Sequence, residues 1–392
     1  MKLNKFLIIL FPVFLALPDF ALNVGAINLR FDDVIIYLLL ILNITDFFKT
    51  KVHTFLKIQY YLLFYAIISL LIIITFKAEY ISNYEAIRSL GSIPFLLVLP
   101  VVMNSSEYRK YIYFGTLIGG GIYIISLITN YNAILIEGEL LKTAASFKRE
   151  ISFSSLNPNA VATLGVILGW INILAYSENK KKYHFILGVL LLIIPFLIYA
   201  RATSIGVAIS ISILIIFQKK KLKTYLFYFI SLFIVWFSIT YFVNSELIDS
   251  ATNVNLQTGE GLSGRYLLWE QGLSIIEKAP ILGHGFCTEH MLYVKYFNGH
   301  MSHQIFIHYA IELGIINLLI FTISMFIILT DRFRTYRKKL KITYIIQFAI
   351  ILTFFIADMT GQLLYFNKYA YIIFAISSFN LISSSTKHVQ KL

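Results

Sequence analysis

Residues 58–76 read IQYYLLFYAIISLLIIITF, a run of nineteen residues without a formal charge. A helix needs about 20 apolar residues to cross a bilayer core, so this segment is long enough to span a membrane. Similar runs recur along the 392-residue chain, which is 58% hydrophobic and 14% charged. Soluble proteins have about 45–50% and 25%. The sequence therefore predicts an all-α polytopic membrane protein. It excludes a soluble enzyme, a disordered chain and, with one cysteine, a disulfide scaffold.

Twelve segments have the length and composition of transmembrane helices. They are residues 6–24, 31–48, 57–76, 89–106, 111–131, 157–177, 185–200, 202–217, 224–243, 304–330, 342–361 and 369–386. The first also resembles a signal peptide. Because no small-residue cleavage site follows it, we interpret it as a retained helix.

The distribution of basic residues predicts the orientation. With the N-terminus inside, seven segments face the cytoplasm and hold 22 Lys and Arg against 4 Asp and Glu, whereas the rest holds 11 and 16. These segments are residues 1–5, 46–57, 105–110, 178–184, 218–223, 331–341 and 385–392. Lys and Arg concentrate in cytoplasmic loops, so both termini are predicted to lie inside. The net charge of +13 thus reflects topology and not nucleic-acid binding.

Two outer loops, about 132–156 and 244–303, are longer than the other connections. We therefore divide the chain into three parts: residues 1–243 with helices 1–9 and the first long loop, the large outer loop 244–303, and residues 304–392 with helices 10–12 and a cytoplasmic tail. Long ordered loops usually carry function, so we expect the chemistry in 244–303. Within it, 264–278 has helical spacing and ends before Pro280. It fits either an amphipathic helix at the membrane interface or a helix packed on the bundle.

Two arginines stand where an anion would be bound. Arg201 separates two uncharged runs, and Arg265 opens the helix predicted in the large loop. Arginine suits bidentate phosphate recognition, and a helix N-terminus also attracts anions. The alternatives are a snorkelling side chain for Arg201 and a solvated helix-start charge for Arg265.

Four further ionisable residues lie at or near the membrane: His303, His308, Glu312 and Asp358. Intramembrane ionisable residues usually mark functional sites, and histidine accepts a proton near neutral pH. A packed structural histidine and a solvated aspartate at a helix end remain the alternatives. The histidines of the loop match no compact zinc spacing, so we predict no metal site.

Four motifs occur in order across the second half of the chain. They are Gly264-Arg265-x-x-x-Trp269, Pro280-x-x-Gly283-x-Gly285-Phe286, Ser302-His303-Gln304 and Glu312-Leu313-Gly314. Together they resemble the O-antigen ligase and polymerase superfamily, as do Asn157-Pro158-Asn159-Ala160 and the junction at Arg201. Gln304 stands where that family usually has asparagine.

The resemblance implies a GT-C-like membrane glycosyltransferase that takes a glycan from undecaprenyl pyrophosphate at the outer (periplasmic) face of the inner membrane. A polymerase passes the glycan to the next lipid-linked repeat unit, and this is the predicted function; a ligase, the alternative, passes it to lipid A core. A flippase or transporter is a remote third, because several spans carry no charge. The implied partners are the lipid-linked donor and acceptor, membrane lipids and a chain-length regulator, with no cofactor.

The resemblance and the chemistry together assign roles to the candidate residues. Arg201 and Arg265 neutralise the pyrophosphate, and His303 is the base that activates the acceptor hydroxyl, with inversion at the anomeric carbon. The predicted substrate-binding residues are Glu312, Trp269, Gln304, His308 and Asp358.

Overall fold

The computed structural model describes residues 2–17, 21–24, 27–136, 158–197, 200–217, 262–297, 301–302, 304–359, 365 and 367–379. The described helices are α1 (Lys2–Leu15), α2 (Phe31–Lys49), α3 (Thr54–Phe76), η1 (Ala78–Tyr80), α4 (Asn83–Gly91), α5 (Ile93–Asn104), α6 (Ser106–Ile136), α8 (Pro158–Asn179), α9 (Lys182–Leu197), α10 (Arg201–Phe217), α12 (Leu262–Ile276), α13 (Glu289–Phe297), α14 (Ile305–Lys339), α15 (Ile342–Asp358) and α16 (Lys368–Ser378). The predicted span 224–243 lies outside these residues.

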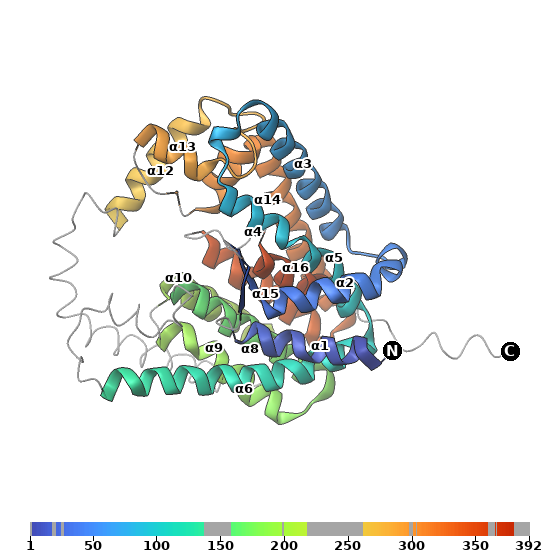
Figure 1. Cartoon of the computed structure of the whole chain (residues 1–392). Helices are drawn as coiled ribbons and strands as arrows, with labels where there is room; N and C mark the ends of the chain where they lie inside the picture. The colour runs from blue at the N-terminus through green and yellow to red at the C-terminus, as the bar shows by residue number, and fades with distance from the viewer. Residues whose placement is uncertain are drawn as a thin grey trace.

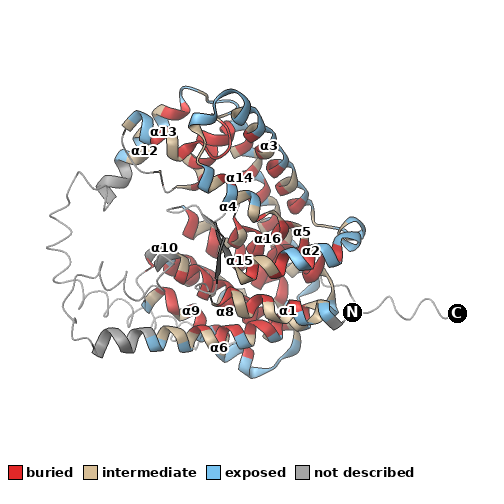
Figure 2. Cartoon of the chain, in the orientation of Figure 1, coloured by how far each residue is buried: buried red, intermediate tan, exposed pale blue. Residues whose placement is uncertain are grey.

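The helices pack in three groups. Helices α1, α6, α8 and α9 form one side, and α2, α5, α10, α15 and α16 fill the centre (Figure 1). On the opposite side α3 and α14 pack together, and the short helices α12 and α13 lie over one end of α14. Buried residues run through all three groups (Figure 2), and most of the apolar ones belong to one large core, with a smaller cluster at α12 and α13.

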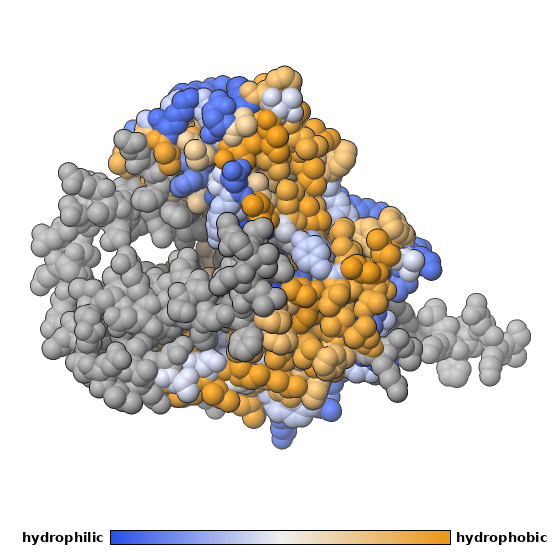
Figure 3. All heavy atoms as spheres, in the orientation of Figure 1, coloured by the Kyte–Doolittle hydropathy of each residue, from blue (hydrophilic) through white to orange (hydrophobic). Residues whose placement is uncertain are grey.

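Five described helical segments are long and apolar enough to cross a membrane. They are Thr54–Phe76, Asn83–Asn104, Ser106–Thr129, Ala160–Asn179 and Ile305–Lys339. Large apolar side chains also cover the outer face of the pair α3–α14, where Phe64 is 64% and Phe326 59% exposed. Figure 3 shows this hydrophobic surface over α3 and hydrophilic residues above α12 and α13. The protein is therefore an integral membrane protein with a helical fold; the count of twelve spans and the N-in orientation remain predictions.

The predicted first span is wrong in its second half. Helix α1 ends at Leu15, and Ala21–Val24 forms strand β1, paired antiparallel with β2 (Ile27–Arg30) so that Ala21 faces Arg30. The sequence contains Pro18, which cannot donate the backbone hydrogen bond that a continuing helix needs. The connection to α2 is therefore a short hairpin.

Helix α14 is longer than the predicted span 304–330 and continues to Lys339. The side chain of Arg332 is buried, and its Nη1 donates to Gln347 Oε1 (3.1 Å) and to the Phe379 carbonyl (3.1 Å). These contacts extend the helix beyond the apolar run. Basic residues in the last turn, Arg337 to Lys339, also suit a helix C-terminus.

Helices α3 and α14 run antiparallel, and this sets the position of the site. Near one end His53 contacts Asp331 (3.2 Å); further along, Gln59 Nε2 donates to Ser324 Oγ (2.9 Å). Near the other end the Phe286 N–H donates to Ser69 Oγ (3.2 Å). The 23 residues of α3 span about 35 Å. The basic segment 331–341 and the segment around Phe286 therefore lie at opposite ends of the pair.

Candidate active site

The turn Pro280–Phe286 docks on a break in α14. Gly314 has φ 80° and ψ 168°, so the helical backbone is interrupted there. The turn supplies hydrogen-bond partners that the interrupted helix lacks. The N–H groups of His284 and Gly285 donate to the carbonyls of Ile311 (2.7 Å) and Glu312 (2.9 Å). In return the Ile315 N–H donates to the Pro280 carbonyl (2.9 Å). Two of the sequence motifs thus form one structural unit, since each supplies the backbone partners that the other lacks.

Two glycines in this unit sit where no side chain fits. Gly283 and Gly314 have φ of 75° and 80°, the left-handed region that favours glycine. A Cβ on Gly283 would lie 2.5 Å from the Glu312 carbonyl oxygen, and one on Gly314 would lie 2.0 Å from the Ile281 oxygen. The close approach of the two backbones therefore requires glycine on both.

Glu312 fastens the next stretch of the loop to α14. Its carboxylate is fully buried, and its oxygens accept from the Cys287 N–H (2.8 Å), from the Glu289 N–H (3.1 Å) and from the hydroxyl of Tyr365. Buried carboxylates require such partners, because an unpaired one is very costly. In this structure Glu312 positions protein segments; substrate binding by Glu312 remains a prediction.

Glu289 is a second buried carboxylate beside the first. Its Oε1 accepts from the N–H (3.1 Å) and the hydroxyl (2.6 Å) of Ser302, and its Oε2 pairs with Nδ1 of His308. Nε2 of His308 lies 3.8 Å from Glu312 Oε2, so the imidazole stands between the two carboxylates. Burial raises the pKa of Glu289, but the attraction of His308 and the hydrogen bonds from His308 and Ser302 outweigh it, and the pKa is lowered.

The residues on both sides of position 303 are held in place. Besides its bonds to Glu289, Ser302 accepts a hydrogen bond on its carbonyl from the indole N–H of Trp269 (3.1 Å). Gln304 is the N-cap of α14, where its side-chain oxygen accepts from the Ile307 N–H (2.7 Å). In this structure Trp269 and Gln304 therefore support the chain that flanks the predicted base.

Helix α12 packs on the bundle, and this confirms the helix predicted over 264–278 within about two residues. Its Ile275 and Ile276 are buried in a small apolar cluster with Leu292 and Tyr293 of α13 and Ile311 of α14. The Tyr293 hydroxyl also donates to the Leu268 carbonyl (2.6 Å). Of the two interpretations of this helix, packing on the bundle accounts for its buried face.

Arg201 and Asp358 begin and end two neighbouring helices. Thr353 Oγ1 of α15 donates to Ser210 Oγ of α10 (2.8 Å), and a Cβ on Gly206 would lie 2.3 Å from the Thr353 carbonyl oxygen. Phe217, at the far end of α10, contacts Phe333 of α14, which in turn contacts Phe348 in the first half of α15. The helices are therefore antiparallel, and Arg201 and the fully buried Asp358 lie at the same end.

A comparison with known protein families finds a match over the segments that carry these motifs. Residues 186–322 match the family model described as Wzy_C, O-Antigen ligase. This segment is similar to an O-antigen ligase domain. The domain runs from α9 to the first half of α14 and includes all four motifs and Arg201. No curated protein matches the chain. The matched segment covers about a third of the 392-residue chain.

The three predicted catalytic groups of the O-antigen ligase domain fall beyond the described side chains. Arg201 is the first residue of α10 and Arg265 is the fourth of α12, but their side chains lie outside the described part, as does His303. Their catalytic roles stay predictions. Sequence reasoning missed Glu289 and Tyr365, because a single glutamate after a turn and a lone tyrosine after a helix carry no distinctive pattern.

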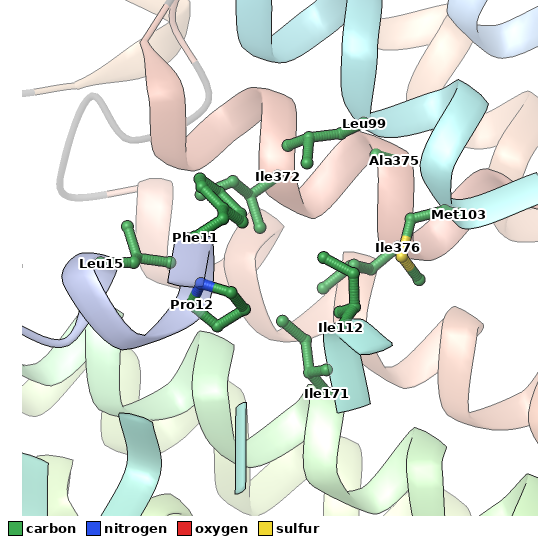
Figure 4. A pocket seen from close by; sticks show the side chains of 10 residues that line it. All are labelled: Phe11, Pro12, Leu15, Leu99, Met103, Ile112, Ile171, Ile372, Ala375 and Ile376. Atoms are coloured by element: carbon green, nitrogen blue, oxygen red, sulfur yellow. The ribbon is translucent and has the colours of Figure 1, made fainter. Parts of the chain in front are cut away.

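A pocket elsewhere in the molecule offers no alternative site. It lies among α1, α5, α6, α8 and α16, and Figure 4 shows its lining. All ten lining side chains are apolar: Phe11, Pro12, Leu15, Leu99, Met103, Ile112, Ile171, Ile372, Ala375 and Ile376. Such a lining provides no hydrogen-bonding or charged group for a sugar or a pyrophosphate. The buried cluster around Glu289 and Glu312 therefore marks the candidate active site of the O-antigen ligase domain.

Proposed function

We propose that the protein is a surface-polysaccharide polymerase. It transfers a growing glycan from undecaprenyl pyrophosphate to a sugar hydroxyl of the next lipid-linked repeat unit. One observation carries this proposal: the four motifs of the matched segment contact one another in two pairs, and Trp269 and Gln304 fix the chain on both sides of residue 303. A reaction that needs a positioned base requires such anchoring.

The donor is an activated sugar that leaves as a lipid pyrophosphate. The leaving group therefore needs charge neutralisation more than a general acid. Arg201 and Arg265 supply this, since guanidinium groups bind phosphate oxygens in a bidentate manner and act more strongly where water is excluded. Arg201 and Asp358 lie at the same end of the helix pair, which supports placing both residues in one site.

His303 acts as the base on the acceptor. It takes the proton of the acceptor hydroxyl as that oxygen forms a bond to the anomeric carbon of the donor. The bond from this carbon to the pyrophosphate oxygen breaks, and its electron pair leaves with the pyrophosphate. Direct displacement inverts the configuration of the anomeric carbon. The scheme uses no metal ion, because the arginines carry the charge neutralisation.

The outer face of the cytoplasmic membrane is the proposed place of this chemistry. The basic residues 332–341 lie at one end of the α3–α14 pair, and the unit around Glu312 lies at the other. Basic segments stay in the cytoplasm, so the opposite end faces outward. Lipid-linked repeat units are presented to the site from that side of the bilayer.

An O-antigen ligase is the second candidate, and the family description favours it directly. It would use the same arginines and histidine and would differ only in the acceptor, the lipid A core. A deletion strain separates the two functions. Single repeat units on the core establish a polymerase, whereas long chains left on the lipid carrier establish a ligase.

The catalytic assignment is tested on purified protein with a lipid-linked repeat unit as substrate. His303→Ala should lower chain synthesis by about 10²–10⁴-fold while substrate binding persists. Arg265→Ala and Arg201→Ala should abolish synthesis, and lysine at either position should restore little. The matched controls are His290→Ala in α13 and Arg334→Ala at the basic end, which should stay near wild type. Near-normal synthesis by His303→Ala would remove that residue from the mechanism.

A further inference from the structure

Glu289 links the loop turn, α14 and the segment before residue 303. Its backbone N–H is held by Glu312, and its side chain holds both the N–H and the hydroxyl of Ser302. The other carboxylate oxygen pairs with His308 of α14. Glu312 therefore holds the backbone of Glu289, and Glu289 in turn holds Ser302, the residue next to His303.

We propose that Glu289 is a positioning residue that sets the placement of the segment bearing His303. This inference rests on the proposed role of His303 as the base. Ser302 donates two hydrogen bonds to Glu289, one from its backbone N–H and one from its hydroxyl. Together they fix both its backbone and its side chain. A carboxylate makes such bonds shorter and about twice as strong as a neutral acceptor does. The Ser302 carbonyl is fixed separately by Trp269, so three bonds converge on this residue.

Burial strengthens the hydrogen bonds of this arrangement. Glu289, Ser302 and Glu312 are completely buried, and His308 is nearly so. In such surroundings, polar bonds are electrostatically stronger than in water and an unpaired group is costly. The Ser302 segment therefore has one strongly preferred position, since any displacement leaves the Glu289 carboxylate without its donors. Misplacing a reacting group by about 1 Å costs on the order of 10²-fold in rate.

The test compares variants of this link with a matched acid on the same loop. Glu289→Ala removes both bonds to Ser302, and Glu289→Gln keeps an oxygen acceptor of the same reach. Ser302→Ala removes the hydroxyl bond alone and serves where Glu289→Ala does not fold. The control is Glu277→Ala, because Glu277 is exposed just after α12. Two readouts are used: steady-state kinetics with the lipid-linked substrate, and maleimide labelling of a His303→Cys protein that also carries Cys287→Ser.

A positioning role makes a specific forecast for the kinetics. Glu289→Ala should lower kcat by about 10²-fold with KM within a fewfold of wild type, because the arginines proposed to bind the pyrophosphate are left in place. Glu289→Gln should recover most of the loss, and Ser302→Ala should fall between the two. Glu277→Ala should match wild type. A rise in KM without a fall in kcat would overturn the inference and assign Glu289 to substrate binding.

Labelling separates this inference from the proposed function. In the His303→Cys background, Glu289→Ala and Ser302→Ala should change the labelling rate, whereas Glu289→Gln and Glu277→Ala should leave it near that of the background. If labelling changes while His303→Ala remains active, the placement by Glu289 stands and the base assignment falls. Unchanged labelling and unchanged kcat in both Glu289→Ala and Ser302→Ala would overturn the positioning role.

Discussion

At the scale of single residues, a buried carboxylate has to find a donor for each of its oxygens. Glu312 finds them in Cys287, Glu289 and Tyr365, three points that are well separated along the chain. A side chain with this many protein partners has little capacity left for a substrate. Its main effect in the structure is to hold the loop against α14.

Replacing Glu312 tests this holding role. Glu312→Ala leaves the N–H groups of Cys287 and Glu289 without their acceptor, and each such loss costs about 1–3 kcal/mol. We expect a clearly lower melting temperature in detergent and faster proteolysis within 280–302. Glu270→Ala is the control, since Glu270 is exposed on α12. Wild-type melting of Glu312→Ala would show that the carboxylate does not hold the loop.

The glycine at the break in α14 provides a test of the close approach between the loop backbone and α14. Gly314→Ala puts a Cβ 2.0 Å from the Ile281 oxygen and forces alanine into a left-handed backbone, a cost of about 1–3 kcal/mol before the clash is counted. Gly121→Ala in α6 is the control, because nothing lies within 4 Å of a Cβ there. Alanine should leave or raise the stability of α6, as it is the better helix former. Equal melting temperatures for the two variants would contradict the close approach of the backbones.

The lowered pKa of Glu289 predicts acid sensitivity of the loop. The charged form of Glu289 stabilises the fold fully above its usual pKa of about 4.3, and this contribution disappears as the pH falls through the lower folded-state value. Between about pH 5 and pH 3, the wild type should therefore lose more stability than Glu289→Gln, which has no such proton to take up. Thermal unfolding across that range measures the difference, and parallel curves would argue against a charged Glu289.

At the scale of elements, long apolar runs are the part of the fold that could be predicted from the sequence. Helices α2, α3 and α8 begin and end within about three residues of their predicted spans, because hydropathy alone sets them. The hairpin of β1 and β2 could not be predicted, since β1 lies inside an apolar run. The break at Gly314 could not be predicted either, because only the docked turn accounts for it.

The contact between α12 and Ser302 can be tested on one indole. Trp269→Phe removes the N–H that donates to the Ser302 carbonyl while keeping an aromatic ring. We expect a several-fold loss of chain synthesis, in line with a hydrogen bond worth about 1 kcal/mol. Trp170→Phe in α8 is the control, because the indole N–H of that buried tryptophan has no partner among the described residues. Equal activities of the two variants would separate Trp269 from the site.

At the scale of the whole molecule, the candidate site was predictable as a place but not as a set of contacts. The sequence pointed to Glu312, His308 and Trp269. In the structure Glu312 and His308 contact Glu289 directly, and Trp269 is linked to it through Ser302. Glu289 itself could not be found, because its partners come from positions 302, 308 and 312 and only the folded chain makes them neighbours. The side chains that would complete the chemistry are still predictions from sequence.

The orientation in the membrane gives the last prediction. With Cys287→Ser as background, Lys338→Cys should react with an impermeant maleimide only from the cytoplasmic side, and Glu277→Cys only from the outside. These positions lie at opposite ends of the α3–α14 pair, and both are exposed. Labelling of intact cells and of inverted vesicles provides the comparison. Reaction of Lys338→Cys in intact cells would reverse the proposed sidedness.

The bond between Tyr365 and Glu312 also has a consequence for biosynthesis. The two residues are 53 positions apart, and Tyr365 is made last. At about 5–20 residues per second, a ribosome needs roughly 3–10 s to cover that interval. Throughout this delay the Glu312 carboxylate lacks the hydroxyl donor of Tyr365, although its donors Cys287 and Glu289 have already been made. The last of these bonds to Glu312 therefore forms only after residue 365 has been translated.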